Sequence, residues 1–200
     1  MLSATLGGGV VVSERQAELL YGHYRLLERW RRVVNLAKFG DWREAVRRHY
    51  AESLFLARQL PEGRLRILDV GSGAGFPGIG IAAARTDCEV VLAEARHRKA
   101  AFLREATRDW ANVCVYFGRA EELAGPFDWV VARAVRPEVA VRVAALVGSR
   151  VGLLTRVGAV RGVGNQVKAG AKKVVRWGAP IAVPWAQGRA VVLGEILPGP

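Results

Sequence analysis

The sequence predicts an α/β protein with a doubly wound, mostly parallel sheet and an N-terminal helical cap. From residue 66 onward, short apolar runs rich in β-branched residues alternate with helical segments. The first sixty residues instead show apolar residues at helical spacing. Near-continuous apolar strands separated by helices are typical of a parallel sheet that is covered on both faces. We therefore divide the chain into a helical cap, residues 1–62, and an α/β domain, residues 63–200.

Two start signals predict the helices of the cap. Ser13 followed by Gln16 has the spacing of a capping box, and apolar residues then recur at helical spacing as far as residue 34. Asp41 with Glu44 begins a second helical stretch, which runs towards residue 60 and ends before Pro61.

Seven apolar runs predict the strands of the α/β domain, at residues 67–70, 90–94, 113–117, 129–132, 151–155, 174–177 and 190–196. Helical stretches starting near Pro77, Arg98, Ala120 and Glu138 lie between the first five. The last two strands are separated by proline and glycine without a helical pattern. We therefore expect them to form an antiparallel hairpin that closes the edge of the sheet.

The composition favours a protein that binds a polyanion. The formal net charge is +12 over 200 residues, and nucleic acid is the commonest partner of such a basic surface. The alternative is that the excess of arginine over lysine reflects the base composition of the genome. No apolar run is long enough for a membrane span, and residues 1–12 lack the pattern of a secretory signal. We expect a cytoplasmic protein that does not bind a membrane.

The cysteines and histidines predict no metal site. Cys114 falls in an expected strand and Cys88 lies at the approach to another, and in such segments buried thiols are a simpler interpretation than a disulfide. The three histidines are not spaced with them as zinc ligands.

A glycine-rich turn between a strand and a helix is the strongest functional signal, and residues 68–78 read LDVGSGAGFPG. Glycines permit positive φ angles and let a ligand approach the backbone closely. Gly73, Gly75 and Gly78 match the G-x-G-x-x-G of dinucleotide-binding enzymes. The longer D-x-G-x-G-x-G pattern begins at Asp69 and favours S-adenosylmethionine, because a carboxylate repels a pyrophosphate but not an ammonium or sulfonium group.

Glu94 ends the next expected strand, where a carboxylate can accept hydrogen bonds from both ribose hydroxyls of either cofactor. The alternative is a solvated charge at the end of the strand.

Several separated motifs resemble those of one family. Besides DVGSGAGFPG at 69–78, they are VNL at 34–36, RH at 48–49 followed by ES at 52–53, RK at 98–99 followed by FL at 102–103, GRAEE at 118–122 and ARAV at 132–135. Together they resemble the ribosomal RNA small subunit methyltransferase G family, also called RsmG or glucose-inhibited division protein B. Two departures are Glu52, where the family has aspartate, and Arg156, where it has lysine.

The resemblance implies a class I methyltransferase, Rossmann-like fold that binds S-adenosyl-L-methionine. It implies cofactor contacts at Gly71, Phe76, Ala120, Glu121 and Arg133, in addition to Gly73 and Glu94 from the patterns above. A surface arginine is the alternative for Arg133.

The activity that the resemblance implies is methylation of N7 of a guanine in the 530 loop of 16S ribosomal RNA (rRNA). Guanine N7 carries a free lone pair at neutral pH, so no catalytic base is assigned, and a helix-capping or RNA-contacting role is favoured for His49. The expected partner is 16S ribosomal RNA or the small ribosomal subunit, with the enzyme a monomer. Alternatives are a methyltransferase acting on another RNA or a small molecule, an RNA-binding ribosome assembly factor with weak activity, and a nicotinamide-dependent oxidoreductase.

Two groups of arginines would border one cationic mouth if the cap folds over the carboxyl edge of the sheet. They are Arg25, Arg29, Arg32, Arg47 and Arg48 in the cap, and Arg96, Arg98, Arg133 and Arg136 near that edge.

Overall fold

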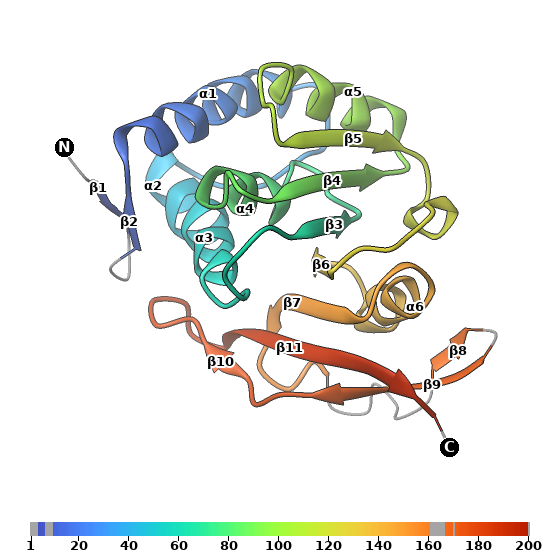
Figure 1. Cartoon of the computed structure of the whole chain (residues 1–200). Helices are drawn as coiled ribbons and strands as arrows, with labels where there is room; N and C mark the ends of the chain where they lie inside the picture. Colours follow the sequence, from blue (N-terminus) through green and yellow to red (C-terminus); the bar gives the residue numbers. More distant parts are fainter. Residues whose placement is uncertain (1–3, 7–9, 161–166, 170, 200) are drawn as a thin grey trace.

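A computed structural model describes residues 4–6, 10–160, 167–169 and 171–199 (Figure 1). The predicted α/β class and the mostly parallel sheet are confirmed. The parallel strands are β3 (Arg66–Val70), β4 (Glu89–Glu94), β5 (Val113–Phe117), β6 (Trp129–Arg133) and β7 (Arg150–Arg156). All five match the expected positions to within two residues at each end.

An antiparallel extension completes one side of the sheet, opposite the side that carries β5 (Figure 1). It contains β8 (Val167–Ala169), β9 (Ala171–Trp177), β10 (Ile181–Ala182) and β11 (Arg189–Pro198). β11 pairs with β7, β9 and β10, so the predicted antiparallel pair of last strands is confirmed. A separate hairpin of β1 (Ala4–Leu6) and β2 (Val10–Val12) was not predicted.

The strand order is β5-β4-β3-β6-β7-β11-β9-β8 in the described part of the chain. From β3 the chain first moves outward to β4 and β5, and then returns to the other side of β3 to form β6. The order therefore reverses between β3 and β6. Ligands of open α/β sheets bind at the carboxyl ends of strands at such a switch point.

Three helices and one short turn connect the parallel strands. They are α4 (Gly78–Ala84), α5 (His97–Ala106), the 3₁₀ turn η3 (Ala120–Glu122) and α6 (Pro137–Val147). The predicted starts of α4, α5 and α6 are correct to within one residue. The helix expected near Ala120 is wrong, because β6 begins soon afterwards and Gly125 and Pro126 leave no room for more than one turn.

The N-terminal helices are α1 (Glu14–Trp30), α2 (Trp42–Ala45), the π-helical turn η2 (Val46–Tyr50) and α3 (Ala51–Ala57). The capping box of Ser13 and Gln16 is confirmed, and the Asp41 carboxylate accepts a hydrogen bond from the Glu44 N–H at 2.8 Å. The second predicted stretch is helical as far as Ala57, with η2 in its middle.

Alternate residues of the central strands face two separate hydrophobic clusters. Ile67 of β3 packs with the N-terminal helices, α4 and α5, whereas Leu68 packs with α6. The cap therefore shares one core with the face of the sheet that α4 and α5 cover. It does not fold over the carboxyl edge as a separate layer, since α1 packs on α4 and α5 and α3 packs on α4.

No helix in the described ranges is both long and apolar enough to cross a membrane.

Candidate active site

The glycine loop follows β3 at the switch point of the sheet. Gly71, Gly73 and Gly75 have φ angles of 65°, 60° and 92°, which is the left-handed region where side chains are strained. The N–H groups of Gly71 and Ser72 both donate to the Ala93 carbonyl of β4, at 2.9 and 3.1 Å. These hydrogen bonds fix the loop across the carboxyl ends of two neighbouring strands.

Only part of the loop is free to meet a ligand. A Cβ on Gly78 would lie 2.2 Å from the Leu92 side chain, so this glycine is required for packing. A Cβ on Gly73 would meet nothing closer than the Gly71 carbonyl at 3.7 Å and Lys99 Nζ at 4.0 Å. The open side of the loop is therefore at Gly73, where a ligand can approach the backbone.

Asp69 does not face this open side, contrary to the expectation that its carboxylate meets the cationic half of a cofactor. Its side chain is fully buried, and its Oδ2 accepts a hydrogen bond from the Gly78 N–H at 3.0 Å. The N–H groups at the start of a helix lack partners within the helix, and here the carboxyl supplies one. Burial raises the pKa of the Asp69 carboxyl to about 7, with the Gly78 N–H acting in the opposite direction. Asp69 thus connects the loop to α4.

Glu94 holds the loop from β4. Its Oε2 accepts from the Gly73 N–H at 3.0 Å and its Oε1 from the Arg96 N–H at 2.8 Å, and the side chain is 6% exposed. Each carboxylate oxygen can accept a second hydrogen bond, so these contacts leave lone pairs for a ribose. Glu94 is positioned both to shape the loop and to bind a ligand.

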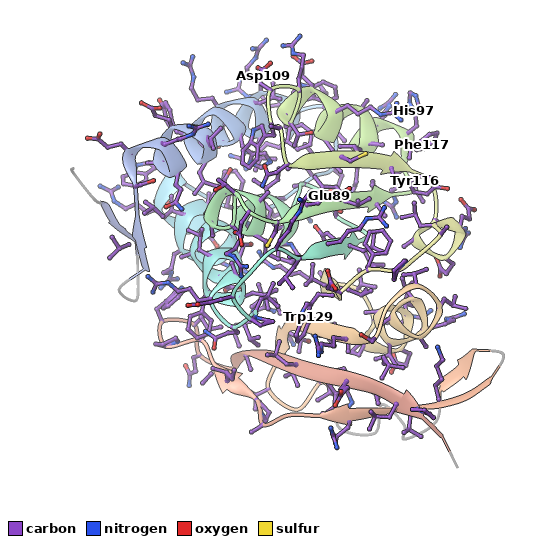
Figure 2. All side chains as sticks on the ribbon, viewed as in Figure 1. Glu89, His97, Asp109, Tyr116, Phe117 and Trp129 are labelled. Carbon is purple, nitrogen blue, oxygen red and sulfur yellow. The ribbon has the colours of Figure 1, made fainter. Side chains whose placement is uncertain are left out.

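Ala120 and Glu121 lie just after β5, on the same edge of the sheet. Ala120 is buried against the α6 face, whereas Glu121 is exposed. The Gly118 N–H donates to the Glu94 carbonyl at 3.2 Å, which joins this segment to the end of β4. Nearby, His97 and Phe117 pack edge to face with ring centroids 5.5 Å apart (Figure 2).

Phe76 is the one predicted site residue that lies behind the loop. It is 6% exposed, its ring stacks on His49 at 5.0 Å between centroids, and Tyr50 packs edge-on at 4.9 Å. In the same cluster, His23 Nδ1 is 2.7 Å from the Tyr50 hydroxyl and its Nε2 is 3.0 Å from the Ala74 carbonyl. The N-terminal helices thus support the loop from inside the protein.

Burial controls the protonation of the histidines in this cluster. It lowers the pKa of His23 to about 4, against a weaker effect of the Ala74 carbonyl. Burial, followed by the positive charge of Arg133, lowers the pKa of His49 to about 4 as well. Both imidazoles are neutral at pH 7, so an Nε2–H on His23 donates to Ala74 while its Nδ1 accepts from Tyr50.

These shifts predict a net loss of stability in acid. A depressed histidine pKa destabilises the fold as the pH falls from 6.5 to about 4, whereas the raised pKa of Asp69 destabilises it as the pH rises from 3.8 to about 7. In this pH range the effect of the two histidines on stability exceeds the opposite effect of the single carboxyl by one titrating group. The free energy of unfolding should therefore fall by about 1.4 kcal/mol for each unit by which the pH is lowered between about pH 6.5 and 4. Urea unfolding at several pH values measures this slope.

Asp69→Asn provides the matched control for this prediction. Without the offsetting carboxyl, the slope should steepen to roughly 2.7 kcal/mol per pH unit. A flat profile in the wild-type protein would show that the buried histidines do not control its acid stability.

A cationic cavity of about 630 Å³ lies at the carboxyl ends of β6 and β7. Its charged lining consists of Arg47, Arg48, Glu52, Arg133, Arg156 and Arg189. Arg47 and Arg48 of the cap and Arg133 of the edge thus meet as the sequence suggested for a shared cationic mouth. The expectation is wrong for the other members of the two groups, which do not line this cavity. In the cap, α1 packs on α4 and α5 instead, which keeps Arg25, Arg29 and Arg32 away from it, and at the edge Arg96, Arg98 and Arg136 lie outside its lining.

Arg133 connects this cavity to the glycine loop. Val70 pairs with Ala132 in the sheet, so Arg133 ends β6 beside the point where Gly71 follows β3. Its side chain is 12% exposed, its Nη2 lies 3.7 Å from Glu52 Oε2, and its buried Nη1 makes no hydrogen bond to a residue that the structure describes. Burial lowers the pKa of the guanidinium to about 10, although Glu52 raises it.

The structure thus brings together all predicted site residues except Phe76 along one edge. The sequence did not predict the roles of Glu52, Arg189 and His23. The spacing of Arg48, His49 and Glu52 was a signal for Glu52, since residues three and four apart share a helix face. For Arg189 the sequence carries no pattern. Among the described residues, no group of three or more histidine, cysteine or acidic side chains is arranged to hold a metal.

Structural comparison identifies the fold. Fibrillarin from Aeropyrum pernix, solved with natively bound S-adenosyl-L-methionine, has a TM-score of 0.53 and 18% identity over 72% of this chain and 73% of that one. The 23S rRNA methyltransferase ErmE has a TM-score of 0.52 and 17% identity over 75% and 69%. At such identities the likeness shows the fold alone, which is the class I S-adenosylmethionine-dependent methyltransferase fold that the sequence predicted.

Sequence comparison then identifies the family. Residues 16–152 match the family described as GidB, rRNA small subunit methyltransferase G. The ribosomal RNA small subunit methyltransferase G of Halorhodospira halophila is 40% identical over 146 residues, 72% of this chain and 66% of that protein. That of Nitrosococcus oceani is 40% identical over 130 residues, 63% and 60% of the two chains. The chain belongs to the rRNA small subunit methyltransferase G family, and the predicted family is confirmed.

The chain spans less than two thirds of the length of several curated relatives: the match covers 60% of the Nitrosococcus oceani protein, 65% of that of Leptothrix cholodnii and 62% of that of Methylobacillus flagellatus.

Proposed function

We propose that this protein transfers a methyl group from S-adenosyl-L-methionine to N7 of a guanine in the 530 loop of 16S ribosomal RNA. One observation carries the proposal: the open glycine loop at the switch point adjoins a cavity lined by five arginines. The loop suits a cofactor that approaches the backbone closely, and the arginines suit the phosphates of a nucleic acid. Membership of the family supports this donor and this acceptor.

The residues along the carboxyl edge fit the cofactor. We assign Gly71 and Gly73 to backbone contacts on the open side of the loop, and Glu94 to the ribose hydroxyls. Ala120 and Glu121 border the adenine at the end of β5, and Phe76 holds the loop from behind. The buried Nη1 of Arg133, which has no hydrogen-bond partner within the described ranges, is a donor suited to an anionic group of the cofactor or the RNA. When bound, S-adenosylmethionine supplies an electrophilic methyl group.

The reaction requires alignment rather than proton removal. The N7 lone pair of guanine is free at neutral pH, so it can attack the methyl group directly. His49 is unsuited to act as a base, because it is 9% exposed and stacks on Phe76. Holding two reactants in the correct geometry can lower the reaction barrier by about 7–11 kcal/mol. We propose that the loop and the arginine cavity provide that positioning, in a monomer that meets ribosomal RNA or the small subunit in the cytoplasm.

Replacement of Glu94 should weaken cofactor binding. Glu94→Ala removes the acceptor of the Gly73 and Arg96 N–H groups together with the proposed ribose contact. We expect the free energy of S-adenosylmethionine binding to become less favourable by about 1–3 kcal/mol, as measured by calorimetry. Glu89→Ala, at the other end of β4, is the matched control and should bind normally. Equal affinity of the two variants would remove Glu94 from the site.

The experiment that tests the proposed function uses a cell extract and S-adenosylmethionine with a labelled methyl group. We expect the label in ribosomal RNA. Label only in proteins or small molecules would overturn the RNA substrate while leaving the cofactor in place. A calorimetric titration in which NADH binds and S-adenosylmethionine does not would instead favour the nicotinamide alternative.

A further inference from the structure

Glu52 is a buried carboxylate in a cavity otherwise lined by arginines. It belongs to α3 and is 2% exposed. Among the described residues that line the cavity, Glu52 alone is acidic. Arg189 Nη2 donates to its Oε2 at 3.0 Å, and Arg133 Nη2 lies 3.7 Å from the same oxygen. Its other oxygen, Oε1, accepts no hydrogen bond from any residue in the described ranges.

A site that bound only phosphate would gain nothing from this carboxylate. Guanidinium groups are hydrogen-bond donors only, and five of them already suit an anion. A carboxylate beside them repels an anion and attracts a group that carries N–H donors. The cavity therefore combines a surface for phosphate with one strong acceptor for a donor-rich group.

Guanine presents such a group on the edge opposite to its N7 side. N7 and O6 are acceptors, whereas N1–H and the N2 amino group are donors. Adenine has an unprotonated N1 and no N2 amino group, so a carboxylate at this place favours guanine over adenine.

We propose that Glu52 determines specificity by accepting hydrogen bonds, through Oε1, from the N1–H and N2 amino group of the target guanine. The inference rests on the proposed function and identifies how the acceptor base is selected. The position supports it: Glu52 pairs with Arg133, which ends β6 beside Gly71 of the glycine loop. A guanine that donates to Glu52 from its N1–H and N2 amino group then has its N7 side directed towards that loop.

The test compares guanosine with inosine at the target position of a 16S rRNA fragment or subunit. Inosine keeps N7 and N1–H but lacks the N2 amino group. For the wild-type protein we expect kcat/KM to fall by about 10- to 100-fold on inosine, the effect of losing a hydrogen bond to a charged group. For Glu52→Gln, whose neutral amide oxygen is a weaker acceptor than the carboxylate, the guanosine-to-inosine ratio should fall clearly below that of the wild type.

Two further variants separate recognition from structure. Glu52→Asp retains the carboxylate and should retain a preference for guanosine. Glu89→Gln, on the exposed start of β4, should behave as the wild type (Figure 2). A loss of stability or of overall rate in Glu52→Gln would change both substrates alike and leave the ratio unchanged.

Two results would overturn the inference: a wild-type protein that methylates inosine as well as guanosine, or a Glu52→Gln variant that keeps the full preference. The wild-type comparison decides even if the variant fails to fold. If the wild-type protein methylates neither RNA, the proposed function itself fails and the inference fails with it.

Discussion

Gly73→Val is expected to abolish binding of S-adenosylmethionine, with the dissociation constant rising by more than about 100-fold. A side chain at this position would project into the open space on the ligand side of the loop, where the nearest atom is 3.7 Å away. The methyl groups would occupy the place in which the cofactor approaches the backbone. Calorimetric titration of the purified variant measures the effect.

Gly63→Val controls for backbone strain. Gly63 also has a positive φ, at 91°, and nothing lies within 4 Å of its Cβ position, but it precedes β3 at the opposite edge of the sheet. Both variants should lose about 1–2 kcal/mol of stability, since left-handed geometry is strained for valine. Only Gly73→Val should lose the cofactor. Normal binding by Gly73→Val would place the cofactor elsewhere.

Arg133→Met is expected to lower kcat/KM for methyl transfer by on the order of 100-fold. The change keeps most of the buried side-chain volume but removes the guanidinium that links the cofactor loop to the arginine cavity. It also removes one of the two arginines that hold Glu52. The assay measures initial rates on small ribosomal subunits or 16S rRNA.

Arg29→Met is the control for the loss of positive charge. Arg29 is exposed on α1, outside the cavity. Its replacement should leave turnover unchanged, and any phosphate contact that it makes would lower the log–log salt slope of RNA binding by roughly 0.7–0.9. If both variants lost activity equally, Arg133 would be only one more charge on a basic surface.

The sequence predicted the central sheet because its strands are buried on both faces. Such strands are continuous apolar runs, and the residues between them have helical periodicity. The glycine loop was equally evident, because its backbone requires glycine at fixed positions. The η3 turn was missed because residues 119–124 are compatible with a helix locally, whereas Gly125, Pro126 and the nearby start of β6 leave room for only one turn.

The arginine cavity was predictable only in part. Glu52 and Arg189 form their hydrogen bond across 137 residues of sequence, and no local pattern joins a helix of the cap to the last strand. The orientation of the Asp69 side chain could likewise not be predicted from the sequence, because a carboxyl near the end of β3 can face either the ligand or α4. Packing decides between them, since Gly78 leaves space for the carboxyl at the start of α4.

The most direct test of the proposed function maps the methyl group itself. Small ribosomal subunits that lack the modification are incubated with the protein and labelled S-adenosylmethionine, and the 16S rRNA is then treated with borohydride followed by aniline. We expect one labelled guanine in the 530 loop, and chain cleavage at that nucleotide, because methylation at N7 makes the ring reducible and the base easily lost, after which aniline breaks the chain. A labelled nucleotide that resists this cleavage, or that lies outside the 530 loop, would contradict the proposed reaction at N7.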